Sequence, residues 1–532
     1  MALCLLFVAI ACARIIATYG ALSLTYDEAF HFACGIRYLS NQGLMEVENP
    51  PVTRAMMALP AYEAGVRPAG LDAPYSEGLA LLARSGNFDR TVFLMRLGNL
   101  PFFLMACFAV AAWSWHWYSK PEAVIAVALF TLLPTVLADA GLFTTDMSVG
   151  ATVTAAFVAA MFWAERPTVP RAILVAFCAA LAFQSKYTSL GYLTLSTALS
   201  LLCCAVSAKH PNWRSFRQWA GQRLPTFLLA TLTLGCLLWG CYRFSFGPVV
   251  SRRLGISTLP APEFFAGLQR VAQHVARGHP AFLLGRISST GWWYYYPVAL
   301  LVKLPIAFLL LAALGLYVCI RRWARPAYLF PLAFCAGILL PAMASRIDIG
   351  VRHIEPIYAG LALIAALGMV RLLQWERFGV ATAGVLFLWM IISVALHHPD
   401  YLAYFNGFAG KHPENVLVDS NYDWGQDLKF LAKRLHELGV EEVSMAVLDE
   451  VKRYDYMQAW YGLPKIKPLD PVRPAAGWNV VSVTVDKALR KDILNGKTDV
   501  IPWYDQMPPT ERVGTFLLYY IAPGTESPVP PL

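Results

Sequence analysis

Residues 3–22 read LCLLFVAIACARIIATYGAL, and this apolar stretch matches the roughly 20 residues that a helix needs to cross the hydrocarbon core of a bilayer. Asp27 and Glu28 follow shortly after it, at the membrane edge. Charged groups at a membrane have a high free-energy cost, so two adjacent carboxylates there mark a candidate functional site. The stretch therefore predicts both a membrane-embedded fold and the place where its chemistry lies.

The rest of the chain has the same apolar texture. Of its 532 residues, 57% are hydrophobic and 14% are charged, and the mean hydropathy is +0.50. This excludes an ordinary soluble globule, in which about 25% of residues are charged. Stretches without Asp, Glu, Lys or Arg recur at 97–112, 123–138, 147–164, 172–185, 187–208, 224–242, 304–320, 327–344, 356–370 and 379–396. With residues 3–22 they predict a polytopic all-α membrane protein of about 11 transmembrane helices.

Charges in the short loops predict the orientation, because Lys and Arg are retained on the cytoplasmic side. With a cytoplasmic amino terminus, the inward loops carry an excess of cations, namely Lys120, Arg166, Arg171, Lys209, Arg214, Arg217, Arg223, Arg321, Arg322, Arg325, Arg371 and Arg377. Residues 23–90, 244–292 and everything from about 398 then lie outside. The net charge of +9 follows mostly from this topology, so it predicts no nucleic-acid partner.

Two domains are expected. Residues 1–397 form the transmembrane domain with the outer loops 23–90 and 244–292, where Thr53–Glu63 is apolar enough for a short interfacial helix and Trp292–Tyr296 resembles an aromatic belt. Residues 398–532 have the texture of an extracytoplasmic α/β domain. Its expected strands are Val416–Asp419, Glu442–Leu448, Trp478–Val485 and Val513–Ile521, and its expected helix is Gly425–Leu438, with Asp423 and Gln426 in capping-box spacing.

The cysteines give no sign of disulfides or metal binding. Nearly all of the eleven lie in apolar stretches, there is no CxxC, and 398–532 contains none. The first apolar stretch lacks a basic segment before it and contains Arg14, so an uncleaved first helix is expected rather than a signal peptide.

Polar residues at membrane depth or at its outer edge collect on one side of the predicted bundle. They are Asp27, Glu28, His31, Asn49, Arg54, Asp139, Asp146, Lys186, Lys303, Arg346, Asp348, Arg352, His353 and Glu355. Carboxylates and cations gathered on one face suit a reaction in which a hydroxyl loses a proton while an anionic group departs.

Simpler interpretations of these residues stay open. Asp27 and Glu28 can be solvated loop acids, with Asp27 capping a helix from His31 to Leu39, and Asp146 can cap the fourth span. Lys186 can extend to the lipid headgroups. Lys303 lies about 15 Å into its helix beyond the aromatic belt, where an ammonium needs an anion nearby. Arg352 and His353 can pair with Asp348 and Glu355 or bind phosphate.

The chain resembles the polyprenyl-phosphate-dependent glycosyltransferases of the GT-C superfamily, which include protein O-mannosyltransferases and lipid A aminoarabinose transferases. The resemblance rests on Asp27, Glu28, His31, Gly35, Tyr38, Leu39 and Asn49–Pro51; on Thr144–Asp146; on Tyr295–Pro305; on Gly350–His353 with Pro356 and Tyr358; and on Tyr401–Gly410 and Asp419–Asp427. The motifs span nearly the whole chain, and the ordered set is more specific than the acidic pair alone.

The resemblance implies a transferase with a polyprenyl-phosphate-linked sugar donor and an acceptor at the outer membrane face. Asp27 would be the general base, and Glu28 would orient it or the donor. Lys303 and Arg352 would bind the donor phosphate, with Arg54 and His353 in reserve and His31, Asp146 and Lys186 as further site candidates. A single displacement implies inversion at the sugar carbon.

The resemblance favours an enzyme without a cofactor. A divalent metal held by Asp27, Glu28 and Asp146 is the less favoured possibility. The expected location is the bacterial inner membrane, with the active site and carboxyl terminus outside. The acceptor, a lipid, glycan or protein, stays open, as do the sugar and the carrier length. A lipid-linked sugar transporter or flippase, or an inactive glycan-binding relative, are the alternatives.

Overall fold

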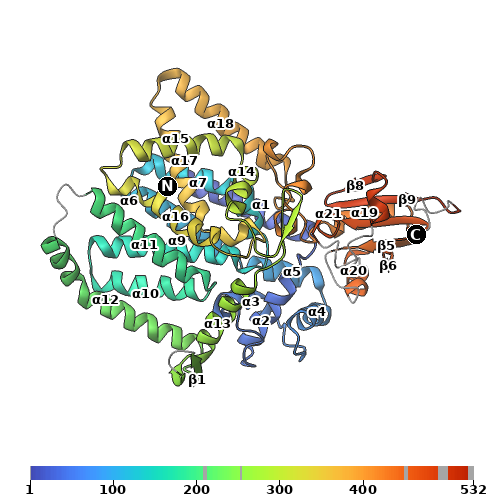
Figure 1. The fold of residues 1–532 in the computed structure, drawn as a ribbon, viewed down its shortest axis with the longest axis horizontal. Coiled ribbons are helices and arrows are strands. Elements are labelled where there is room, and N and C mark those ends of the chain that lie inside the picture. Colours follow the sequence, from blue (N-terminus) through green and yellow to red (C-terminus); the bar gives the residue numbers. More distant parts are fainter. Residues whose placement is uncertain (1, 208–212, 252–254, 448–452, 489–500, 525–532) are drawn as a thin grey trace.

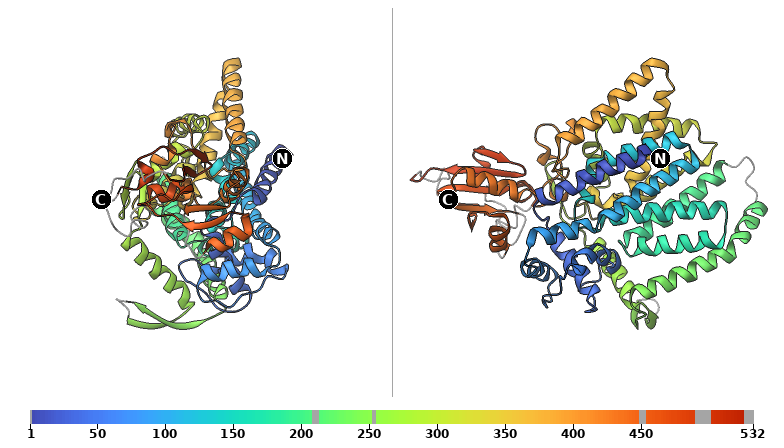
Figure 2. Two further views of the ribbon diagram at one scale, coloured as in Figure 1. Left: turned by 90° about the vertical axis from the view of Figure 1, so that its right-hand side faces the viewer. Right: turned by 180° about the vertical axis from the view of Figure 1, so that it is seen from behind.

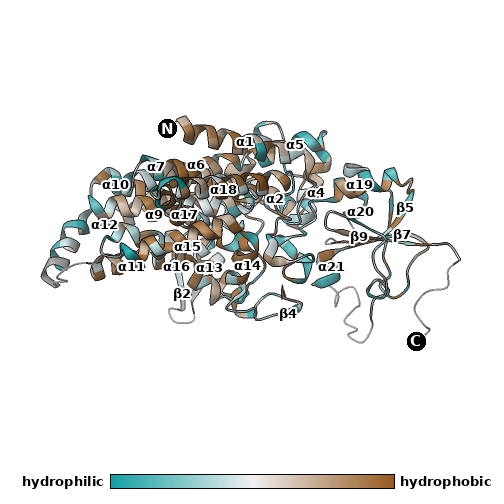
Figure 3. Ribbon diagram, turned by 90° about the horizontal axis from the view of Figure 1, so that it is seen from above, coloured by the Kyte–Doolittle hydropathy of each residue, from teal (hydrophilic) through white to brown (hydrophobic). Residues whose placement is uncertain are grey.

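The computed structural model describes residues 2–207, 213–251, 255–447, 453–488 and 501–524. Helices fill one large body, and a small sheet domain projects from one end of it (Figure 1). Apolar residues dominate the helices of the body, whereas the sheet domain mixes polar and apolar residues (Figure 3). The predicted fold class, a polytopic helical membrane protein with a carboxyl-terminal α/β domain, is confirmed.

All eleven predicted apolar stretches lie in helices. Within the described residues, seven helical segments are long and apolar enough to cross a membrane: α1 (Ala2–Ala21), α5 with α6 (Phe88–Leu97 and Leu100–Trp117), α9 (Thr145–Glu165), α11 (Thr188–Ser207), Arg217–Cys241 within α12 (Trp213–Cys241), η1 (Pro326–Tyr328) with α16 (Phe330–Met343), and α18 (Glu376–Leu396). Each is apolar over the length that hydrocarbon requires.

The remaining four stretches fall short of a straight span. α7 (Lys120–Thr131) meets α8 (Pro134–Ala140) at a bend of 68°, and α14 (Tyr295–Lys303) meets α15 (Ile306–Arg321) at 118°. Pro134 and Pro305 stand at these bends, where a proline cannot continue the hydrogen-bond ladder. α10 (Val169–Phe183) and α17 (Ile357–Leu373) are apolar but short. The described residues thus hold seven to nine spans by length and composition, fewer than the predicted eleven.

The predicted outer loop 23–90 is helical rather than irregular. It contains α2 (Glu28–Leu39), α3 (Pro51–Glu63) and α4 (Pro74–Arg84), and α3 and α4 each begin with a proline at the first helical position. The helices pack closely: a Cβ on Gly78 would lie 2.0 Å from the carbonyl oxygen of Ala29. The helix predicted over Thr53–Glu63 is confirmed, and it buries Met57, Ala58 and Ala61 in the protein.

The predicted outer loop 244–292 contains a hairpin and a helix. Strands β1 (Phe246–Ser251) and β2 (Gly255–Pro260) pair antiparallel, with Phe246 opposite Pro260. α13 (Pro262–Arg277) follows, and then the short antiparallel pair β3 (Ala281–Leu283) and β4 (Arg286–Ser288). The expected aromatic belt is split, because Tyr295 and Tyr296 are buried whereas Trp293 is 68% exposed.

The sheet domain has five strands in the order β6-β5-β7-β9-β8. β5 (Glu442–Ala446) pairs parallel with β6 (Lys465–Pro468) and β7 (Gly477–Ser482), while β9 (Phe516–Ile521) pairs antiparallel with β7 and β8 (Glu511–Val513). α19 (Leu428–Glu437) and α20 (Tyr454–Tyr461) pack on this sheet, and α21 (Val483–Lys487) follows β7.

Several predictions for this region are confirmed and others are wrong. The strand predicted at Glu442–Leu448 is confirmed over Glu442–Ala446, and Leu448 lies outside the described residues. The helix predicted at Gly425–Leu438 is confirmed over Leu428–Glu437. The strand predicted at Trp478–Val485 ends at Ser482, and Val513–Ile521 holds the end of one strand and the whole of another. Val416–Asp419 is not a strand. The capping box is wrong, because Asp423 accepts hydrogen bonds from Gly425 and Thr484 instead.

Residues 398–427, here called the connector, join the helical body to the sheet domain. Tyr401, Leu402, Ala409, Leu417 and Trp424 bury their side chains in the core of the helical body. Its regular structure consists of three short 3-10 turns, η3 (Gly407–Ala409), η4 (Pro413–Asn415) and η5 (Asp419–Asn421). The connector therefore packs with the membrane part, beside the place where the sheet domain projects (Figure 2).

Candidate active site

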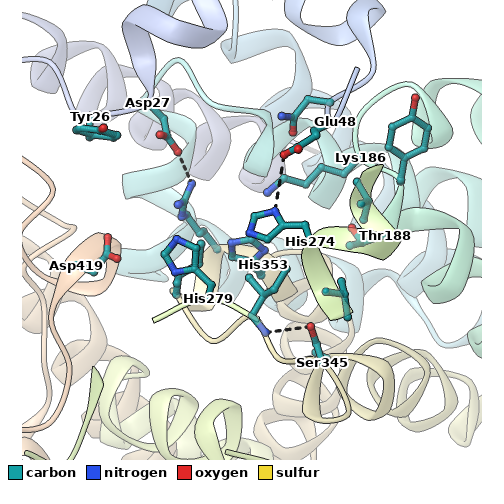
Figure 4. A pocket seen from close by; sticks show the side chains of 18 of the residues that line it. Tyr26, Asp27, Glu48, Lys186, Thr188, His274, His279, Ser345, His353 and Asp419 are labelled. Carbon is teal, nitrogen blue, oxygen red and sulfur yellow. Dashed lines mark hydrogen bonds and ion pairs between the residues drawn. The ribbon is translucent and has the colours of Figure 1, made fainter. Parts of the chain in front are cut away.

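A cavity of about 1170 Å³ lies where the connector meets the helical body. Its walls come from α2, α11, α13, α16, the connector, and η2 (Val351–Ile354). The walls combine charged, histidine and aromatic side chains with apolar ones. Figure 4 shows Asp27 and Asp419 on one side and Lys186, Glu48 and Thr188 on the other. A large concave pocket with a few convergent polar groups is the usual form of an active site.

Asp27 stands at the edge of this cavity, immediately before α2. Its side chain does not cap the helix. Instead, Oδ2 accepts a hydrogen bond from Nη1 of Arg352 at 3.0 Å, and Oδ1 accepts one from the Tyr75 hydroxyl at 3.2 Å. In Figure 4 the dashed line from Asp27 marks the ion pair with Arg352. The carboxylate is 22% exposed, so a ligand in the cavity can reach it.

Arg352 is held from several sides. Its Nη1 also lies 3.7 Å from Oδ2 of Asp146, its Nε donates to the Ser420 hydroxyl at 3.0 Å, and its guanidinium carbon lies 4.1 Å from the centre of the Trp424 ring. Burial opposes the charge, but the carboxylates of Asp27 and Asp146 raise the pKa of Arg352 above its usual range. The group is a fixed cation on the cavity wall.

Asp146 and Lys186 extend the charged wall. Asp146 lies in the first turn of α9, is buried, and accepts a hydrogen bond from the Lys186 ammonium. Its carboxylate does not cap the helix. The Lys186 side chain lines the cavity and is turned to Asp146 rather than to lipid headgroups. Two cations and two carboxylates thus alternate from Asp27 through Arg352 and Asp146 to Lys186.

Two histidines add neutral polar groups to the same walls. Burial lowers the pKa of His31 to about 4, and burial with the nearby charges of Lys186 and Arg352 lowers the pKa of His353 well below its usual value. Nδ1 of His31 and Nε2 of His353 are buried and have no hydrogen-bond partner among the residues that the structure describes. Both rings can therefore form a hydrogen bond to a molecule in the cavity.

Glu28 does not reach the cavity. Its carboxylate is fully buried and accepts hydrogen bonds from Nε and Nη2 of Arg96 at 2.9 and 2.7 Å, and from the backbone N–H groups of Thr25 and Phe143. Consecutive residues at a helix start point in different directions, so the acidic pair divides between cavity and core. Glu28 stabilises the structure behind Asp27.

Lys303 also lies away from the cavity. Its ammonium donates to the backbone carbonyls of Leu402, Tyr404 and Asn421 at 2.7, 2.6 and 2.6 Å, and it lies 4.3 Å from the centre of the Phe405 ring. All four belong to the connector. A buried ammonium needs a negative partner, and the oxygens of these three carbonyl dipoles take the place of the expected anion. The ammonium thereby holds the connector against α14.

Arg54 has a similar supporting position. Its guanidinium is 1% exposed and donates to Glu46 and to the backbone carbonyls of Asn49 and Pro50. Glu48 and Asn49, in the loop that Arg54 holds, line the cavity. Arg54 therefore shapes the wall without contributing its own charge to it.

Several residues at the site were not among the sequence candidates. Tyr75 reaches Asp27 from α4, His274 approaches Glu48 from α13 at 3.7 Å, and Asp419, Ser420 and Trp424 come from the connector. In the sequence, the Asp419–Asp427 run carries the family resemblance and predicts local structure, but it does not by itself predict site residues. Its many acidic and amide side chains next to a tryptophan were the available signal.

A metal fits this site poorly. Within the part of the chain that the structure describes, no group of three or more His, Cys, Asp or Glu side chains is arranged to hold an ion. Asp27 and Asp146 are the carboxylates nearest to such a role, but Nη1 of Arg352 lies between them. The guanidinium already occupies the position where a divalent cation would bridge the two carboxylates.

Comparison with known proteins identifies the fold. No protein-family model matches the sequence, and no curated protein is similar to it at a significant level. Solved structures do match. ArnT from Cupriavidus metallidurans bound to undecaprenyl phosphate is 13% identical, with a TM-score of 0.51 over 97% of both chains.

A second solved structure that matches this chain is that of an archaeal enzyme. The Archaeoglobus fulgidus oligosaccharyltransferase in the apo form is 11% identical, with a TM-score of 0.52 over 93% of this chain and 71% of that chain. The same archaeal enzyme, AglB, in complex with an inhibitory peptide and a dolichol-phosphate gives a TM-score of 0.50. Both proteins are polyprenyl-phosphate-dependent glycosyltransferases of the GT-C superfamily, so the resemblance noted in the sequence is confirmed at the level of the fold.

Proposed function

We propose that this protein transfers a glycosyl group from a polyprenyl-phosphate-linked sugar to an acceptor hydroxyl at the outer face of the membrane. The observation that carries the proposal is the pairing of Asp27 with Arg352 on the wall of a large cavity in a GT-C fold. The pair places a proton acceptor beside a fixed cation, as attack by a hydroxyl on a lipid-phosphate sugar requires. ArnT was crystallised with undecaprenyl phosphate, which supports a donor of this class.

The reaction is a single displacement. The acceptor oxygen forms a bond to the anomeric carbon while the bond from that carbon to the phosphate oxygen breaks, and the bonding electrons leave with polyprenyl phosphate. The hydroxyl proton passes to Asp27. Attack opposite to the leaving group inverts the configuration at the sugar carbon.

The leaving phosphate needs cations rather than an acid, because it departs as an anion. Arg352 and Lys186 line the cavity and supply this charge, so they replace Lys303 and Arg54 as the proposed phosphate ligands. The neutral rings of His31 and His353 contribute hydrogen bonds. These cations provide the positive charge that a divalent ion would give, and we propose that the reaction needs no cofactor.

Donor binding also prepares the base. In the structure, both carboxylate oxygens of Asp27 are engaged, one by Arg352 and the other by Tyr75. A phosphate that binds the guanidinium competes with Asp27 for its N–H groups. The carboxylate is then released toward the acceptor at the moment when the donor is in place.

The test uses purified protein in liposomes with a panel of polyprenyl-phosphate hexoses and pentoses. Mass spectrometry of envelope glycolipids and glycoproteins with and without the protein first identifies the product. Asp27→Asn should then lower the transfer rate by about 10²–10⁴-fold, because general base catalysis contributes that much. EDTA should leave the rate of the wild-type protein unchanged.

Asp72→Asn is the matched control, because Asp72 is an exposed carboxylate in the same loop. It should retain the wild-type rate. Full transfer by a folded Asp27→Asn protein would disprove the role of the base. Movement of intact lipid-linked sugar across the liposome membrane without transfer would instead favour the flippase alternative, to which the bent pairs α7–α8 and α14–α15 are suited.

A further inference from the structure

Two connector residues contact the guanidinium of Arg352 directly. The Ser420 hydroxyl accepts the hydrogen bond from Nε at 3.0 Å, and the Trp424 ring covers one face with its centre 4.1 Å from the guanidinium carbon. Both side chains are 2% exposed. A planar guanidinium held at Nε and stacked on one face has little freedom to change its orientation.

The Ser420 contact is built into the local backbone. The Ser420 hydroxyl donates to the carbonyl of Ile349, and the N–H of Val351 donates to Oδ1 of Asn421 at 3.0 Å. Gly350 lies between these two bonds, and a Cβ there would be 2.4 Å from the Ser420 oxygen. The connector and the turn that carries Arg352 are therefore in contact over consecutive residues.

The connector is itself anchored to α14 and to the residue before Asp27. The Asn421 carbonyl accepts the buried Lys303 ammonium, which fixes the connector against α14. The Trp424 carbonyl accepts a hydrogen bond from the N–H of Tyr26, the residue before Asp27, at 3.0 Å. One short segment thus sets the position of Arg352 and of the backbone that carries Asp27.

We propose that Ser420 and Trp424 are positioning residues that orient Arg352 for the donor phosphate. The inference rests on the proposed function, because it concerns the cation that receives the leaving group. Orientation before binding avoids the loss of side-chain freedom that a mobile arginine would suffer when it meets the phosphate. The connector then contributes to the affinity for the charged end of the donor without supplying a phosphate ligand itself.

The experiment measures the Kd of the full-length protein in detergent for undecaprenyl phosphate and for uncharged undecaprenol. Ser420→Ala and Trp424→Leu should each raise the Kd for undecaprenyl phosphate by about 5- to 10-fold, because each removes one contact of cation–π or hydrogen-bond strength. Neither should change the Kd for undecaprenol. Trp424→Phe retains a ring and should restore most of the affinity that Trp424→Leu loses.

A double-mutant cycle separates positioning from general packing. In an Arg352→Met background, Ser420→Ala and Trp424→Leu should have no further effect on phosphate binding, since the group they orient is gone. Trp478→Leu is the control, because Trp478 lies in the sheet domain against Tyr520. It should leave both Kd values unchanged.

Three results would overturn the inference. The variants could bind undecaprenyl phosphate as tightly as the wild type, lose affinity for both lipids equally, or add their effects to that of Arg352→Met. An unchanged Kd in Arg352→Met alone would show that Arg352 is not a phosphate ligand, and it would remove the proposed function and the inference together. A weakened Arg352→Met with unaffected Ser420→Ala and Trp424→Leu would remove only the inference.

Discussion

Asp27 and Glu28 are neighbours in the sequence with different surroundings in the fold. The Asp27 carboxylate meets Arg352 at the cavity, while the Glu28 carboxylate meets Arg96 in the core. In the buried pair both side chains are fully inaccessible to solvent. Removal of one partner of such a pair leaves an uncompensated charge, whereas the cavity can hydrate the partner of Asp27. Substitution of Glu28 should therefore change the stability of the protein, whereas substitution of Asp27 should change its activity.

Glu28→Gln should destabilise the fold by about 3–5 kcal/mol, because the guanidinium of Arg96 would remain buried without its counter-charge. The measurement is denaturant unfolding of the detergent-solubilised protein. Asp27→Asn, examined in parallel, should unfold at nearly the wild-type denaturant concentration. A stable but inactive Glu28→Gln protein would contradict this view and would indicate that Glu28 takes part in the reaction.

His31 should give the protein a defined pH dependence. Burial lowers its pKa from 6.5 to about 4, with the charge of Arg54 acting in the same direction and Asp27 and Asp146 opposing it. A group whose pKa is lowered by folding contributes stability that is fully present above pH 6.5 and is lost as the pH falls through 4, because the unfolded chain binds the proton more tightly. The whole change corresponds to about 3 kcal/mol.

The measurement compares wild-type protein with His31→Gln in unfolding experiments from about pH 7.5 to about pH 4.5. Both proteins share the other titrating groups, so the difference between their curves isolates the ring. The wild type should lose stability more steeply on acidification. Parallel curves would show that His31 is not held neutral.

Site residues could be predicted from the sequence only when their setting was local. Asp27 was identifiable because an apolar stretch precedes it, and Lys186 and Asp146 because they interrupt such stretches. The role of Lys303 had no local signal, since its partners are carbonyls 99 to 118 residues further along the chain. Every residue has a backbone carbonyl, so the sequence cannot show which carbonyls will surround Lys303. The prediction that Lys303 binds the donor phosphate is therefore not supported by the structure.

At the scale of elements, two glycines allow α15 and α17 to pack closely. A Cβ on Gly315 would lie 1.7 Å from the carbonyl of Ile364, and a Cβ on Gly368 would lie 2.1 Å from the carbonyl of Leu311. Small residues at facing positions let helix backbones approach, which is a common mode of packing in membranes. The crossing positions α17, which leads directly from the turn that carries Arg352.

Gly315→Ala should therefore destabilise the protein by about 1–3 kcal/mol through overpacking. Gly384→Ala is the matched substitution, because Gly384 lies within α18 with no atom within 4 Å of the added Cβ. It should be neutral or stabilising by up to about 1 kcal/mol, since alanine favours a helix over glycine. Equal thermal unfolding temperatures for the two variants would contradict the close crossing.

Helices and strands could be predicted where neighbouring residues determine them, and not where distant residues do. Apolar stretches became helices because every backbone group must be satisfied within hydrocarbon. The connector has no strand at Val416–Asp419, although the apolar residues Leu417 and Val418 predict one, because Leu417 is buried in the core of the helical body and Asp419 has a φ of 59°, outside the strand region. Its shape is set by partners distant in the sequence, such as Lys303 and Arg352.

At the scale of the whole molecule, the cation-rich loops and the cavity lie toward opposite ends of the helical body. α2 and the connector lie toward the end of the body where the sheet domain projects, whereas α12 begins toward the opposite end (Figure 1). Loops near Arg217 are rich in cations, which favours a cytoplasmic location for that end. The orientation with the cavity outside remains a proposal.

Reporter fusions after Ser40, Arg217 and Asp423 test it. A reporter active only outside the cytoplasm should be active at Ser40 and Asp423 and inactive at Arg217, and a cytoplasmic reporter should give the reverse pattern. Any other pattern would place the carboxylate of Asp27 on the side away from the proposed acceptor.

The ion pair at the cavity also governs when the protein becomes competent during its synthesis. Asp27 and Arg352 are 325 residues apart, so at a translation rate of roughly 10 residues per second the carboxylate emerges about half a minute before its guanidinium. Throughout that interval the nascent chain is threaded into the bilayer with only half of the pair. A polypeptide that ends before Arg352 consequently lacks the cation of the pair, and under the proposed mechanism it would transfer no sugar.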